Sequence, residues 1–236
     1  MNKLGIIGGL GPMATVSFMK RIIDMTDASC DQEHIHMVVE HCPTIPDRTA
    51  YILDHSKDNP APAIIEACRI LEGAGVDEIA IPCVTAHFFR DEIAKNTSIP
   101  VLDGVLLSAD YLKSKGVSRV GIMATDGTIK SGIFNKSLSE HGISAVVPSA
   151  KAQKYVMDLI YNDVKGGKPI EQDKFGAVAV ELREEGAEVI ILGCTELSVI
   201  ADEWLPDGRF LDVLSVLSRA CVMDFGKLKG AYRELL

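Results

Sequence analysis

The sequence repeats itself at a spacing of a little under half its length, and this repeat constrains the fold more than any other feature. The segment "DEIAIPCVTAHF" is matched by "AEVIILGCTELS", so Cys83 and Cys194 lie 111 positions apart. The segment "LGIIGGLGPMAT" is matched by "VGIMATDGTIKS", and "IPVLDG" is matched by "GRFLDV", with Asp103 and Asp212 109 positions apart. Three pairs in the same order and at similar spacing predict two related halves.

Strand and helix patterns alternate along the chain. Runs such as "VIILG" are apolar throughout, which favours parallel strands that are covered on both faces. A helix is expected to begin near Pro12, another to cover Ala61–Leu71 with one apolar face, and a last one to span Val213–Lys227. Eight segments are candidate strands: Leu4–Gly8, Ile35–His41, Glu78–Pro82, Val101–Asp103, Arg119–Met123, Ser144–Val147, Val189–Gly193 and Phe210–Asp212.

This alternation predicts the α/β class, with two pseudo-symmetric halves that each hold a mainly parallel sheet flanked by helices. Ligands of such folds bind at the carboxyl ends of the strands, so we expect the site in the cleft between the halves. We place the domain boundaries near Asp103 and Asp212. Residues 1–103 plus 212–236 then form the first domain, with the last helix returning to pack on it, and residues 104–211 form the second.

The composition excludes several classes of protein. The formal net charge of −9 disfavours nucleic acid and anionic membranes as partners. No apolar run approaches the roughly 20 residues that a membrane span needs. The opening "MNKLGIIGGLGP" lacks a cleavage site, so we interpret it as a first strand and expect a cytoplasmic protein. The six cysteines include no C-x-x-C pair, and we expect free thiols.

Cys83 and Cys194 stand out because each ends a buried strand and precedes a helix, with Thr85 and Thr195 as candidate N-caps. A helix N-terminus lowers the pKa of a thiol and can also hold a carboxylate. If the halves face each other, the two sulfurs flank one cleft, and two opposed acid/base groups are what a two-base proton exchange at carbon requires.

The alternative for any single cysteine is that it is inert core filler, since free cysteine is among the most buried residue types. We assign Cys68 and Cys221 to this class because they fall on apolar helical stripes. Cys30 and Cys42 have no partner pattern and are taken as structural.

At these residues the chain resembles the aspartate/glutamate racemase superfamily, and within it the aspartate racemases. The matching stretches span nearly the whole chain in order: "GIIGGLGPMAT", "IPDRT", "PCVTAH", "ATDGT", "YNDVKGGK" and "LGCTEL". The resemblance implies two flavodoxin-like halves with the active site between them, usually in a homodimer. It implies racemisation of a small acidic amino acid, aspartate or else glutamate or a related one, with no pyridoxal phosphate, other cofactor or metal.

The resemblance also implies roles for particular residues. Cys83 and Cys194 match the paired acid/base thiols. The expected substrate-binding residues are Thr85 and Thr195 for the α-carboxylate, Arg48 and Lys165 for the distal carboxylate, Thr125 in the first loop of the second half, and Met13 in the glycine loop. His87 and Glu196 lie close to the cysteines in sequence and are candidates for tuning their protonation.

Two alternatives stay open at this point. "GLGPMA" fits the G-x-G-x-x-A dinucleotide fingerprint after a strand, with Glu40 as an acidic partner 26 residues beyond Ala14, so an oxidoreductase is possible. A non-catalytic binding protein that keeps the racemase scaffold is the second. Its sequence hint is Val84, which replaces the Asn that usually follows the first cysteine and which cannot donate hydrogen bonds. Hydantoin racemisation and maleate isomerisation rank lower, because Arg48 and Lys165 suit a dicarboxylate.

Overall fold

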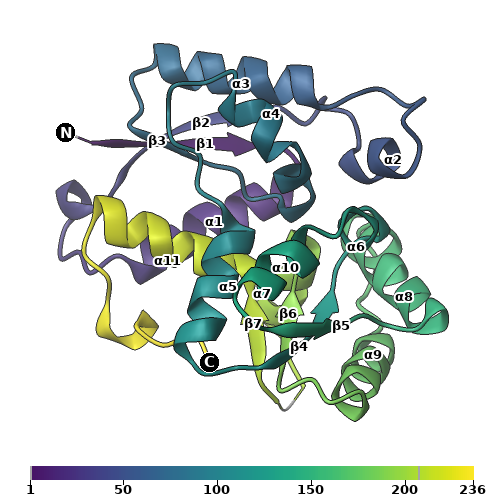
Figure 1. Ribbon diagram of the computed structural model, residues 1–236. Coiled ribbons are helices and arrows are strands. Elements are labelled where there is room, and N and C mark those ends of the chain that lie inside the picture. The colour runs from purple at the N-terminus through teal and green to yellow at the C-terminus, as the bar shows by residue number, and fades with distance from the viewer. Residues whose placement is uncertain (1, 207) are drawn as a thin grey trace.

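A computed structural model describes residues 2–206 and 208–236 as two α/β lobes stacked on one another (Figure 1). The first lobe holds a parallel sheet with strand order β2-β1-β3. Helix α3 covers one face of it and helices α1 and α11 cover the other. The bounds are β1 Lys3–Gly8, β2 His36–His41, β3 Glu78–Ala80, α1 Pro12–Met25, α2 Arg48–Leu53, α3 Ala61–Gly73, α4 Arg90–Ala94 and α11 Val213–Phe225.

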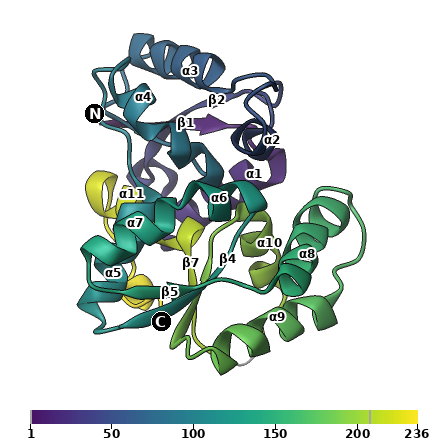
Figure 2. The ribbon, with the colours of Figure 1, turned by 45° about the vertical axis from the view of Figure 1, so that its right-hand side comes forward.

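The second lobe holds a parallel sheet with strand order β5-β4-β6-β7. Helices α5 and α7 lie on one face of this sheet, and α8, α9 and α10 lie on the other (Figure 2). The bounds are β4 Arg119–Met123, β5 Ser144–Val146, β6 Val189–Leu192, β7 Phe210–Asp212, α5 Gly104–Ser114, α6 Asp126–Ser131, α7 Ile133–Glu140, α8 Ala150–Met157, α9 Gln172–Glu184 and α10 Thr195–Glu203. The predicted α/β class with two parallel sheets flanked by helices is confirmed.

The two lobes share one topology. Strands β1 and β4 are central in their sheets, β2 pairs with β1 as β5 pairs with β4, and β3 pairs with β1 as β6 pairs with β4. The place of β7 is taken in the first lobe by Val101, which makes a single parallel bridge to Ile79. The strand expected over Val101–Asp103 is therefore reduced to that bridge, while the other seven predicted strands form.

The repeat extends to the way helices approach the sheets. A Cβ atom on Gly5 of β1 would lie 2.9 Å from Val76 Cγ2, and one on Gly121 of β4 would lie 3.0 Å from Leu182 Cβ. Glycine at both positions therefore permits the close approach, because a side chain there would crowd the segment that covers the sheet. The two glycines are equivalent in the internal repeat.

The chain crosses between the lobes twice, and an aspartate lies at each crossing: Asp103 comes two residues after the Val101 bridge, and Asp212 is the last residue of β7. The carboxylate of Asp103 accepts hydrogen bonds from the first turn of α5, and that of Asp212 accepts one from Leu214 at the start of α11. Helix α11 then packs on α1 and β1 of the first lobe and on α5 of the second. None of the described helices is both long enough and apolar enough to cross a membrane.

Candidate active site

Cys83 and Cys194 occupy equivalent positions just beyond β3 and β6. Each is itself the N-cap residue of the following helix, a 3₁₀-helix over Val84–Phe89 and α10 respectively, with no side chain accepting from the first turn. The expectation that Thr85 and Thr195 cap these helices is therefore wrong, because the helices begin one residue after the cysteines. Both thiols are buried, and both line one enclosed cavity of about 10 Å³, the room of roughly one water molecule.

This cavity brings together most of the residues singled out from the sequence. Beside the two cysteines, its predicted lining residues are Arg48, Thr85, Thr125, Lys165, Thr195 and Glu196. The cavity is also lined by Val84, noted above as a departure from the family pattern, and by four residues that were not expected there: Leu10, Asp47, Thr49 and Tyr161. Asp47 could have been found as the N-cap of α2, since it accepts from Ala50 N. Tyr161 follows from no local pattern.

Three threonine hydroxyls meet between the lobes, and two of them, those of Thr85 and Thr125, belong to residues that line the cavity. Thr85 Oγ1 of the first lobe lies 3.0 Å from Thr128 Oγ1 and 3.2 Å from Thr125 Oγ1 of the second. Thr125 also caps α6 by accepting from Thr128 N. All three are buried. Hydroxyls can turn to donate to an anion, so this part of the lining is suited to a carboxylate.

Glu196 controls the surroundings of Cys194. The Cys194 thiol donates to Glu196 Oε2 at 2.9 Å, and Thr195 Oγ1 donates to the same oxygen at 3.2 Å. Burial, followed by the Glu196 carboxylate, holds the pKa of Cys194 well above its ordinary value, although Lys165 acts in the opposite direction. The expectation of a lowered pKa at the start of α10 is therefore wrong for Cys194, because desolvation and an adjacent carboxylate outweigh the helix N-terminus.

Arg48 is held rigidly in the first lobe. Its terminal nitrogens donate to the backbone carbonyls of Leu10 and Pro46 at 3.0 Å and of Ile45 at 3.3 Å. The Nε atom is buried and has no hydrogen-bond partner. Burial lowers the pKa of Arg48, but the nearby Cys83 and Asp47 raise it, and the net shift is upward. The guanidinium thus stays charged beside Cys83.

Lys165 comes from the second lobe, directly after a π-helical turn over Asp158–Val164. Its Nζ lies 3.8 Å from Glu196 Oε1 and 4.3 Å from the ring centroid of Tyr161. The Tyr161 hydroxyl donates in turn to Asp47 Oδ2 at 3.3 Å. Burial lowers the pKa of Lys165, but the charges of Glu196 and Tyr161 raise it, and the pKa lies above its ordinary value as a result. Lys165 is therefore part of the site rather than a solvated surface charge.

His87 does not line the cavity. It is buried, and its Nδ1 lies 3.8 Å from Asp103 Oδ1, while Arg90 binds the other oxygen of Asp103 at 2.7 Å. Burial lowers the pKa of His87 against the influence of Asp103.

Among the described residues, no group of three or more His, Cys, Asp or Glu side chains is placed to hold a metal ion.

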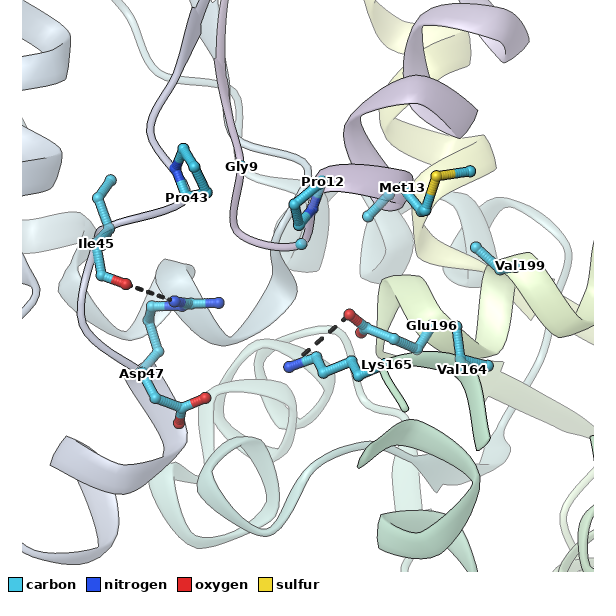
Figure 3. A pocket seen from close by; sticks show the side chains of 13 residues that line it. Gly9, Pro12, Met13, Pro43, Ile45, Asp47, Val164, Lys165, Glu196 and Val199 are labelled. Atoms are coloured by element: carbon cyan, nitrogen blue, oxygen red, sulfur yellow. Dashed lines mark hydrogen bonds and ion pairs between the residues drawn. The ribbon is translucent and has the colours of Figure 1, made fainter. Parts of the chain in front are cut away.

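A second, open cavity of about 510 Å³ adjoins the enclosed one (Figure 3). Met13 lies here, with Pro12 and Val199, rather than beside the cysteines. A Cβ atom on Gly11 would lie 2.9 Å from Glu196 Oε1. The glycine of the dinucleotide-like fingerprint therefore makes room for a carboxylate of the other lobe.

Comparisons with known proteins agree with one another. The family model described as Asp/Glu/hydantoin racemase matches residues 7–218. The broad-specificity amino-acid racemase of Bacillus subtilis (strain 168) is 30% identical over 226 residues, covering 94% of this chain and 97% of its own. The aspartate racemase of Picrophilus torridus is 32% identical with a TM-score of 0.87, covering 99% of this chain and 98% of its own. The glutamate racemase of Aquifex pyrophilus, 20% identical with a TM-score of 0.61, covers 98% and 86% and shares the fold.

Proposed function

The chain belongs to the Asp/Glu/hydantoin racemase family and is an amino-acid racemase, and from that premise we propose that it works without a cofactor through Cys83 and Cys194. The observation that carries this mechanism is that both buried thiols line one cavity, although they come from different lobes. Family membership favours this activity over the dinucleotide-dependent oxidoreductase and the non-catalytic binding protein.

In the proposed reaction the α-carbon of the substrate lies between the two sulfurs. One thiolate accepts the α-proton, and the thiol on the other side donates a proton to the opposite face of the carbanion. The configuration is inverted, one thiol and one thiolate have exchanged roles, and no electrons are lost or gained. Burial of the cavity supports this chemistry, because charged groups stabilise a developing carbanion more strongly where water is excluded.

The ends of the cavity suggest how an acidic amino acid would lie. The hydroxyls of Thr85, Thr125 and Thr195 would bind the α-carboxylate, and Arg48 and Lys165 would bind the distal carboxylate. The buried Nε–H of Arg48, which lacks a partner, supports this assignment because an unpaired buried donor is costly until an acceptor arrives. Aspartate is the proposed substrate, as it is for the Picrophilus relative; the Bacillus relative is named for broader specificity.

A domain division and an oligomeric state are also proposed. The chain divides into residues 1–103 plus 212–236 and residues 104–211, a division supported by the packing of α11 on α1 and β1, although α11 also packs on α5 of the second domain. A homodimer is expected from the resemblance, and sedimentation velocity measures it.

The decisive test is exchange of the substrate α-proton with solvent deuterium, followed by NMR and chiral chromatography. The wild-type protein is expected to label and racemise aspartate, and Cys83→Ser and Cys194→Ser are expected to lower racemisation by at least a hundredfold, since each inversion needs a donor and an acceptor. Cys30→Ser is the matched control, because Cys30 is exposed and outside the cavity. Undiminished racemisation in both active-site variants would refute the two-thiol mechanism.

A further inference from the structure

The enclosed and the open cavity meet where they share lining residues, and the side chains of this passage carry no net formal charge. Four charged side chains line both cavities: Asp47, Arg48, Lys165 and Glu196. Two of them are cations and two are carboxylates, so their formal charges cancel. The terminal nitrogens of Arg48 already donate to three backbone carbonyls, and Lys165 already lies near Glu196 and the ring of Tyr161.

This balance bears on selectivity. A site rejects a ligand that lacks a charged group most strongly when the group's partners are left buried and unpaired. Here the terminal nitrogens of Arg48 and the ammonium of Lys165 keep their protein partners when no distal carboxylate is bound, and the Arg48 Nε–H, which has no partner in the free protein, is the one donor that a neutral side chain leaves unpaired. A substrate with a neutral side chain therefore leaves little uncompensated charge behind.

The open cavity beyond this passage has apolar walls. Figure 3 shows Pro12, Met13, Ile45, Val164 and Val199 around this space, and the charged side chains that line it are the four that also line the enclosed cavity. Its volume of about 510 Å³ is within the usual range for small-molecule pockets. Because the threonine hydroxyls lie on the enclosed side only, a substrate bound by them would direct its side chain past the passage toward this space.

Resting on the proposed function, we infer that the same site also racemises α-amino acids with long, unbranched, neutral side chains, such as norleucine and methionine, whose ends lie in the open cavity. The charge-balanced passage accepts the neutral chain, and the apolar walls remove its end from water. Val199 and Met13 are the wall residues that limit its length.

A homologous series tests this inference. Racemisation of alanine, 2-aminobutyrate, norvaline and norleucine is measured with the wild-type protein, together with aspartate. Burial of one methylene is worth about a fourfold gain, so kcat/KM is expected to rise by about twofold to fourfold per added carbon in a cavity that stays partly open. Racemisation of aspartate with a flat or falling series overturns the inference and leaves the proposed function standing. Racemisation of none of these amino acids overturns both.

Filling the open cavity gives the matching variant. In Val199→Phe the rise along the series is expected to disappear, so that the ratio of kcat/KM for norleucine to that for aspartate falls at least tenfold. Met13→Trp is a second filling variant, at a side chain that is 64% exposed and tolerant of size. Met223→Phe, at an exposed methionine of α11 outside both cavities, is expected to keep the rise. An unchanged ratio in both filling variants contradicts the inference.

Discussion

At the residue scale, the two cysteines are equivalent in the fold but not in their neighbours. Cys194 is followed by Thr195 and Glu196, whose polar atoms face the cavity. Cys83 is followed by Val84, which is buried in the apolar core of the second lobe with Val105 and Ile122. The valine thus has a packing role between the lobes, and in the proposed binding mode the threonines and the cations hold the substrate without an amide at this position.

Replacing Glu196 by Gln should make Cys194 more reactive. Burial and the Glu196 carboxylate both raise the pKa of Cys194, and the substitution removes the second of these causes. The pKa of Cys194 should therefore fall toward, though not reach, its ordinary value. We expect the rate of alkylation by iodoacetamide at pH 8 to rise severalfold at Cys194, as followed by peptide mass spectrometry.

Cys30 gives the internal reference for that measurement, because it is exposed in the same chain and far from Glu196 in sequence. A rate at Cys194 that is unchanged relative to Cys30 would mean that the carboxylate does not control the thiol.

At the element scale, the contact between β3 and α11 contains an unfavourable pair of carboxyl groups. Burial, followed by the charge of Asp224 on α11, raises the pKa of Glu78 from 4.5 to about 7. The folded state therefore binds this proton more tightly than the unfolded chain. The resulting stabilisation is complete below pH 4.5 and is lost as the pH rises through 7.

The variant Glu78→Gln should remove this dependence, because a neutral amide has no proton to lose. Between pH 5 and pH 8 the Tm of the wild-type protein should fall more steeply than that of the variant, and the variant should be the more stable of the two at pH 8. Differential scanning calorimetry at several pH values makes the comparison. Parallel Tm curves would exclude Glu78 as the titrating group.

The same elements show what the sequence could predict. Apolar runs predicted the central strands and the buried face of α3, because those patterns depend on local spacing alone. Val101 forms only a single bridge to Ile79, and its sequence could not predict this, because the length of an edge strand depends on how many residues of the neighbouring strand pair with it. The helix cap beyond β3 was misassigned by two residues and the one beyond β6 by one residue. Tyr161 was missed because its approach to Lys165 and Asp47 depends on a π-helical turn and on contact between the lobes.

At the scale of the whole molecule, the enclosed cavity implies motion. Its volume of about 10 Å³ is much smaller than an amino acid, so we expect the lobes to move apart when substrate enters. Helices α2 and α6 meet across the lobes near this cavity. A Cβ atom on Gly127 of α6 would lie 2.8 Å from Thr49 Cα of α2, so the close approach of the lobes depends on this glycine.

Gly127→Ala should act as a wedge between the lobes. The added methyl group meets backbone that cannot easily move, so we expect the lobes to part and alkylation of both Cys83 and Cys194 to accelerate relative to Cys30. Gly176→Ala is the control, because a Cβ atom there meets nothing within 4 Å in α9. It should leave the alkylation rates as they are. Equal rates in the two variants would show that the contact does not restrict access.

The duplicated fold has a last consequence for the proposed reaction. The internal repeat makes Cys83 and Cys194 equivalent, but no rotation turns one enantiomer of the substrate into its mirror image. The two halves also differ in sequence, since Thr85 stands two residues after Cys83 and Glu196 stands two residues after Cys194. The two free enantiomers have equal free energy and share one transition state, so the Haldane relation requires equal kcat/KM in both directions. The Thr85–Glu196 difference can change how tightly each mirror form is held and how fast it turns over at saturation. It cannot bias the final racemic mixture.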